Sequence, residues 1–170
     1  MNSSASSTTS NTVPEQQLMK TWSRYGGTTL GRKFFSMILG RMIPYSGTIS
    51  ALVESLEAGK CQLVLKDRKK IRNHLNSIHA IALANLGELS SGLAMISAIS
   101  ANTRAIVVNL EIEYLKKARG QLVAQGTANP PDVINESINS IAIAEIFDSE
   151  GDIVSRIKVH WRLSPKESKQ

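Results

Sequence analysis

The chain carries two periodicities of apolar residues, one typical of helices and one typical of strands. Apolar residues recur at helical spacing from Pro14 to Tyr25 and again from Leu30 to Ile43, with Gly26-Gly27 between the two segments. These segments predict two short amphipathic helices. Pro44 ends the second helix, because the residue before a proline is held out of the helical region of backbone space.

The remaining pattern predicts a mostly antiparallel sheet of about six strands around one long helix. The segment Ile78–Ile99 is apolar on all sides and rich in small residues, so this helix must be surrounded by other elements. Alternation from Ile106 to Tyr114 places Ile106, Val108, Leu110, Ile112 and Tyr114 on one face of a strand. The other strands are expected at Thr48–Leu56, Lys60–Lys66, Gly120–Thr127, Ser137–Phe147 and Ile153–Leu163, with a turn at Asp148–Asp152. The expected fold class is α+β.

Composition divides the chain into four parts. Residues 1–13 are nearly all Ser, Thr and Asn, which bury too little apolar surface to fold, so a disordered tail is expected there. A helical extension at residues 14–45, a main domain at 46–165 and a short tail at 166–170 follow. We expect the amphipathic helices to pack on the domain, while their basic flank leaves contact with a membrane surface open.

Length and composition favour one soluble domain with its own core, since the 170 residues are 42% hydrophobic. No run approaches the roughly 18 uninterrupted apolar residues of a membrane span, and no secretory signal is present. The single Cys61 has no intrachain partner, so we expect it buried in a reducing, cytoplasmic compartment. With 5% aromatic residues and no recognition motif, the net charge of +6 does not point to nucleic acid.

Candidate chemistry lies between Asn73 and Ala94. Asn73, His74, His79 and Glu88 are set there among apolar and small residues. Burial would raise the pKa of the Glu88 carboxyl toward that of a useful general base, and a helix N-terminus offers N–H groups to a developing oxyanion. The alternatives are a solvated Glu88, a hydrogen-bonded core histidine at His79 and a structural His74. No Cys cluster or His-Glu-x-x-His spacing occurs, so neither a metal nor a cofactor is expected.

Three segments, in this order, carry a resemblance to a known family. They are Asn73-His74-Leu75-Asn76-Ser77-Ile78-His79-Ala80, then Glu88 nine residues after His79, then Glu113-Tyr114-Leu115-Lys116-Lys117-Ala118-Arg119-Gly120. Together they resemble the hotdog superfamily, in which a sheet wraps a central helix. More closely, they are similar to its acyl-CoA thioesterase group and to a branch catalogued only as a domain of unknown function. The resemblance covers roughly residues 46–165.

The resemblance implies hydrolysis of an acyl-CoA thioester to free acid and CoA. Glu88 matches the family's general base or nucleophile, and Asn73 matches the residue that positions the attacking water. His79 matches the histidine of a His-Gly-Gly motif, whose first glycine N–H polarises the thioester carbonyl. Ala80 stands at that glycine and adds a methyl group without removing the N–H. Val107 stands where some related enzymes supply a serine.

Clustered cations suggest where the phosphates of CoA bind. Lys116, Lys117 and Arg119 follow a strand end at the mouth that such a cleft would have, and phosphate recognition suits grouped cations. A solvated turn is the alternative, and Lys66–Arg72 is a competing phosphate site. The resemblance also implies a homodimer or homotetramer with the site between protomers, and exposed sheet edges favour such pairing.

Two other functions stay open. A non-catalytic acyl- or CoA-binding protein is favoured by Ala80 and Val107. A hotdog hydratase or dehydratase acting on acyl thioesters is suggested because His74 precedes Glu88 by fourteen residues, although the Pro and Gly residues that such enzymes carry between the two are missing.

Overall fold

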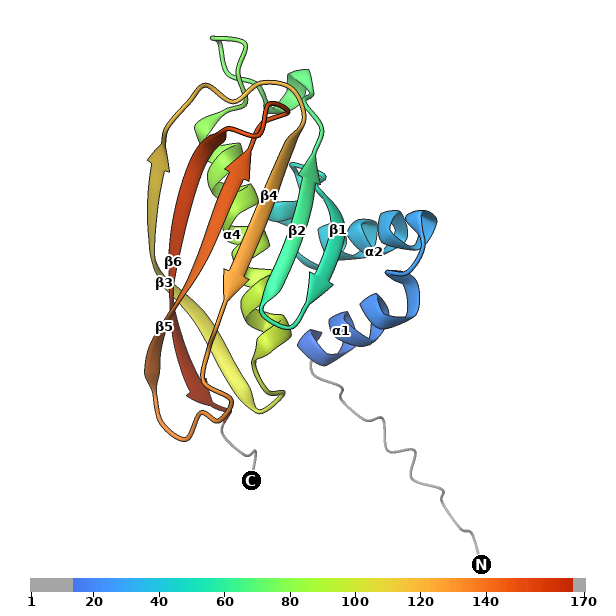
Figure 1. The fold of residues 1–170 in the computed structure, drawn as a ribbon. Helices are drawn as coiled ribbons and strands as arrows, with labels where there is room; N and C mark the ends of the chain where they lie inside the picture. The colour runs from blue at the N-terminus through green and yellow to red at the C-terminus, as the bar shows by residue number, and fades with distance from the viewer. Residues whose placement is uncertain (1–13, 167–170) are drawn as a thin grey trace, which may run out of the picture.

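In the computed structural model, which describes residues 14–166, a six-stranded sheet wraps one long helix (Figure 1). The elements are α1 (Pro14–Tyr25), α2 (Thr29–Met42), α3 (Pro44–Gly47), β1 (Leu52–Glu57), β2 (Lys60–Leu65), a 3-10 turn at Lys69–Ile71, α4 (Ala80–Ala98), β3 (Thr103–Tyr114), β4 (Leu122–Ala128), β5 (Ile138–Phe147) and β6 (Ile153–Pro165). The strands are ordered β1-β2-β4-β5-β6-β3, and every neighbouring pair is antiparallel. The α+β prediction is confirmed. The predicted tail at residues 1–13 and the final residues 167–170 lie outside the described residues.

Helix α4 lies against one face of the sheet, chiefly over β2, β4 and β5. Two glycines permit this close approach: a Cβ on Gly126 would lie 2.2 Å from the Ser90 carbonyl oxygen, and a Cβ on Gly87 would lie 2.6 Å from Cδ1 of Ile157. By length and composition alone α4 would also suit a membrane crossing, contrary to the expectation from the sequence. However, 67% of that apolar window is buried inside the protein, so α4 is a core helix.

A β-bulge in β3 overturns the predicted face of this strand. Val107 pairs with Trp161 and Asn109 pairs with His160, so the register shifts and Val108 stands unpaired between them. One extra residue moves all later side chains to the opposite face. Leu110 and Ile112 therefore pack against the core with Val107, whereas Ile106 and Val108 are 43% and 48% exposed. Tyr114, also predicted on the Leu110 face, is exposed as well.

The strand predicted from Thr48 begins four residues later, at Leu52. The segment Pro44–Gly47 forms the short helix α3, and Ser50 has a positive φ of 48°, so the chain changes direction before β1. Cys61 is buried as expected, and burial raises the pKa of its thiol to about 12.

The two N-terminal helices pack on the domain, as predicted. Phe35 and Leu39 of α2 are buried against the core, and Trp22 of α1 meets Phe35 edge-to-face with ring centroids 5.0 Å apart. The Ser36 hydroxyl accepts a hydrogen bond of 2.9 Å from the Val53 N–H of β1. This contact holds α2 beside β1 (Figure 1).

Candidate active site

Glu88 is half-buried in the middle of α4. Its carboxylate makes no hydrogen bond or ion pair with any residue in the described part of the chain. Desolvation by burial raises the pKa of Glu88 above its ordinary value, because burial removes part of the water that stabilises the charged form. The alternative of a fully solvated helix residue does not fit this environment.

The N-terminus of α4 leaves one backbone donor unused. The His79 ring accepts the Ile81 N–H through Nδ1 at 3.1 Å, and the His79 carbonyl accepts the N–H groups of Ala82 and Leu83 at 2.9 and 3.1 Å. His79 is therefore an exposed N-cap and not a core histidine. The Ala80 N–H has no hydrogen-bond partner among residues 14–166. It lies at the positive end of the helix dipole, where an oxyanion is stabilised.

The loop before α4 is fixed by Asn73. Its Oδ1 accepts hydrogen bonds from the Leu75 N–H at 2.9 Å and from the Ser77 N–H and Oγ at 3.2 Å each. The side-chain oxygen is thus committed to the loop, while Nδ2 donates to no residue that the structure describes. Asn73 can position a water only through Nδ2. His74 is exposed on this loop, and Val107 is half-buried on the inner face of β3.

The hydroxyl of Tyr114 joins the end of β3 to this site. It donates to the Ala80 carbonyl at 3.2 Å. The last residue of β3 and the first residue of α4 are thereby held together.

Ala80 and Glu88 are too far apart in one copy to act on the same carbonyl. Eight residues of helix span about 12 Å, and the Ala80 N–H points away from Glu88 along the helix axis. A carboxylate that acts through one water must lie within roughly 7 Å of the carbonyl oxygen. A single site that uses both groups therefore needs Ala80 from one copy and Glu88 from another.

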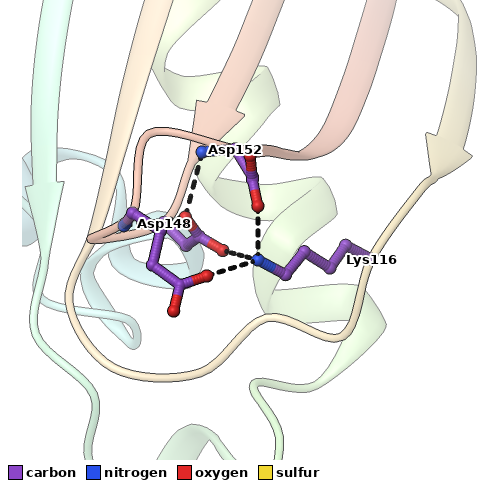
Figure 2. Close-up of polar contacts among 4 residues, drawn as sticks. Lys116, Asp148 and Asp152 are labelled. Atoms are coloured by element: carbon purple, nitrogen blue, oxygen red, sulfur yellow. Dashed lines mark hydrogen bonds and ion pairs between the residues drawn. The ribbon is translucent and has the colours of Figure 1, made fainter.

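Lys116 is enclosed by the acidic turn between β5 and β6 (Figure 2). Its ammonium lies 2.7 Å from the Asp148 carboxylate, 2.9 Å from Glu150 and 2.7 Å from Asp152. These contacts raise the pKa of Lys116, and Lys116 in turn lowers the pKa of Asp148. The Lys116 ammonium lies among these carboxylate oxygens, so a phosphate would have to compete with three carboxylates for it. This geometry weighs against Lys116 as a phosphate ligand.

The other predicted phosphate ligands divide into cations without a partner in the described residues and cations that are already engaged. Lys117 and Arg119 are exposed and have no side-chain partner within residues 14–166. In the Lys66–Arg72 run, Arg72 is paired with Asp67 at 2.7 Å, and Arg68 donates to the Ile49 carbonyl. The turn at Asp148–Asp152 was predicted from the sequence, but its pairing with Lys116 was not, because a contact between residues more than thirty positions apart leaves no local signal.

Several solved structures share this architecture. A structural-genomics protein aligns with a TM-score of 0.76 at 24% identity, over 90% of this chain and 99% of its own. A probable thioesterase from Pseudomonas aeruginosa aligns with a TM-score of 0.67 at 18% identity, over 81% and 96%. A hypothetical thioesterase from Streptococcus pneumoniae, solved with coenzyme A, aligns with a TM-score of 0.62 at 18% identity, over 76% and 99%.

The fold is that of the hotdog superfamily, as the resemblance implied. Residues 31–163 match the family model described as Domain of unknown function (DUF4442), and the chain belongs to this family. No curated protein matches the chain.

Proposed function

We propose that the protein hydrolyses acyl-CoA thioesters, with Glu88 as the general base. The observation that carries this proposal is the half-buried Glu88 carboxylate, which has no partner among the described residues and a raised pKa. Glu88 takes a proton from water, and the water oxygen bonds to the thioester carbon. The Ala80 N–H stabilises the oxyanion. Collapse of the tetrahedral intermediate then breaks the carbon–sulfur bond, and the departing sulfur of CoA takes the proton from Glu88, which restores the carboxylate.

The active unit in this proposal is at least a homodimer. The separation of Ala80 and Glu88 supports a site shared by two copies, and β3 offers a place for them to meet, because it is one of the two edge strands of the sheet, with β1 at the other edge. In the described part of the chain, no strand pairs with the outer edge of β3, which is 12 residues long and of the kind that pairs with another chain. A shared site needs only two copies, and a homotetramer would need a second interface between dimers. Sedimentation that shows a fully active monomer would contradict it.

Recognition of CoA is assigned to Lys117 and Arg119. Both are exposed cations without partners in the described structure, and they lie between β3 and β4. Support comes from the Streptococcus pneumoniae protein of the same fold, which was solved with coenzyme A. Guanidinium and ammonium groups form charge-assisted hydrogen bonds with phosphate oxygens.

The test is release of free thiol from a panel of acyl-CoAs by wild type and by Glu88→Gln. The amide keeps the shape of the side chain but cannot take the proton of the water, so we expect kcat to fall on the order of a hundredfold or more. Glu57→Gln is the matched control, since Glu57 is exposed on β1 and has no side-chain partner in residues 14–166. An unchanged rate in Glu88→Gln would exclude the role.

The second candidate is a non-catalytic acyl- or CoA-binding protein. It is favoured by the methyl group of Ala80, which lies beside the one unused N–H and crowds the oxyanion position. Binding of acyl-CoA without thiol release from any substrate in the panel would support it. Hydration of an enoyl thioester would instead point to the hydratase alternative.

A further inference from the structure

A cavity of about 580 Å³ lies where α2 and α3 meet β1 and β2. This volume is within the range of about 300–1,000 Å³ that is typical of small-molecule sites. Glu88, Asn73, His79 and Ala80 do not line it. The cavity is therefore built largely by the N-terminal extension and the first hairpin, and it is separate from the proposed catalytic groups.

The walls of this cavity are mainly apolar. Leu39, Leu52, Val64 and Leu89 line it, and Leu39 and Leu89 belong to the buried core. Met37 also lines the cavity although it is 46% exposed. An alkyl chain bound here would remove apolar surface of both partners from water, which is the condition for hydrophobic binding.

The charged groups around the cavity are all cationic. Lys33, Arg41, Lys66 and Arg68 line it, and no acidic residue does. Lys33 and Lys66 have no hydrogen-bond or ion-pair partner in the described part of the chain. Within residues 14–166, the Arg41 guanidinium donates only one hydrogen bond, to the Met37 carbonyl of its own helix at 3.5 Å. Such a set of cations without neutralising carboxylates attracts an anion.

We infer that the cavity binds an anionic amphiphile, with its alkyl chain against the apolar walls and its carboxylate or phosphate head at Lys33, Arg41 and Lys66. This inference goes beyond the proposed function, because binding here requires no hydrolysis. No aromatic side chain lines the cavity to stack on a base, and no carboxylate lines it to hold a metal. Arg68 is already engaged with the Ile49 carbonyl and serves as part of the wall.

The first experiment is calorimetric titration of the full chain with decanoate, decyl phosphate and neutral decanol. Each added methylene contributes about fourfold in affinity if the chain is buried, so dodecanoate should bind roughly fifteenfold tighter than decanoate. Decanoate should bind more tightly than decanol. Tighter binding of decyl phosphate than of decanoate would identify phosphate as the preferred head, and the reverse would identify carboxylate. Absence of binding by both anions would overturn the inference.

Matched variants test the location. Lys33→Gln combined with Lys66→Gln should weaken decanoate binding about tenfold and leave decanol binding unchanged. Lys158→Gln combined with Arg162→Gln removes the same charge at exposed positions of β6 and should have no effect. Ala51→Leu places a larger side chain in the cavity wall and should weaken the binding of both decanoate and decanol. Equal losses in the two charge variants would show a general effect of net charge and overturn the inference.

Glu88→Gln separates this site from the proposed catalysis. Decanoate should bind this variant as it binds wild type, whether or not any thioester is hydrolysed. Loss of decanoate binding in Glu88→Gln would show that the two sites are one, which contradicts the inference.

Discussion

Lys116 and Glu88 are both charged groups that the sequence marks as functional, and the structure places them in opposite surroundings. Three carboxylates within 2.9 Å surround Lys116, whereas Glu88 has no partner in residues 14–166. The pKa of each group is raised, but for opposite reasons. For Lys116 the shift means that the charged form is stabilised, and for Glu88 it means that the charged form is destabilised. A satisfied charge fixes a turn, while an unsatisfied one is available for chemistry.

The variant with the largest expected effect tests whether the Ala80 N–H at the N-terminus of α4 takes part in the same reaction as Glu88. Ala80→Pro removes the unused N–H, and the first turn of a helix tolerates proline. His79, which precedes it, has φ −63° and ψ 140°, a conformation that proline favours in its predecessor. We expect kcat to fall about a hundredfold or more while the melting temperature changes little. A loss of helical signal in circular dichroism would show that the lower rate comes from a damaged fold and would contradict a specific role of the Ala80 N–H.

Mixing variants sharpens the same test. If Glu88 acts beside Ala80 of a second copy, a mixture of Glu88→Gln and Ala80→Pro chains forms dimers with one intact site. Random exchange then restores about a quarter of wild-type activity, because half of the dimers are mixed and each has one working site of two. Activity no higher than that of either parent would contradict a shared site.

The next largest effects distinguish the neighbouring residues Lys116 and Lys117 by their influence on stability and on KM. Lys116→Met leaves three carboxylates without their cation, so we expect a lower melting temperature and an unchanged KM. Lys117→Met should raise KM for CoA esters severalfold, leave it unchanged for pantetheine thioesters without nucleotide phosphates, and leave stability unchanged. Thermal melts and steady-state kinetics on both substrates measure these outcomes. The reverse pattern would assign phosphate binding to Lys116.

The smallest effect is a difference in the pH dependence of stability. The raised pKa of Glu88 means that the folded state holds its proton more tightly than the unfolded state, so the free energy of unfolding falls as pH rises through that range. Glu88→Gln should therefore be more stable than wild type at pH 7, and this gain should vanish at acid pH. The lowered pKa of Asp148 has the opposite sign, so Asp148→Asn should lose stability at neutral pH and approach wild type as pH falls. Parallel melting curves across pH would contradict both assignments.

Much of the fold could be predicted from local pattern. Helix α1 has the predicted bounds, and α4 and the hairpin of β5 and β6 lie within two residues of theirs, because each has strong periodicity and a clear turn. The face of β3 could not be predicted, since the bulge at Val108 depends on pairing with β6. Helix α3 was missed because four residues are too few to show a helical period.

The candidate site was predictable in its residues and not in its contacts. An acid inside an apolar helix is visible in the sequence, and Glu88 is half-buried in α4 as predicted. The partners of Lys116 are 32 to 36 residues away and meet it only after β5 and β6 form. The use of His79 as a helix cap was hidden as well, because histidine is not among the preferred capping residues.

Gly87 has a consequence for how this site can change in the course of evolution. A side chain at position 87 would collide with Ile157, so α4 is held against β6 in one rotational setting. Successive residues of a helix are about 100° apart, and this setting therefore determines the direction in which Glu88 points. A larger residue at position 87 would turn the helix and move the carboxylate away from its place. Exposed positions of α2, such as Lys33 and Met37, are by contrast places where side chains can change in size without turning α4.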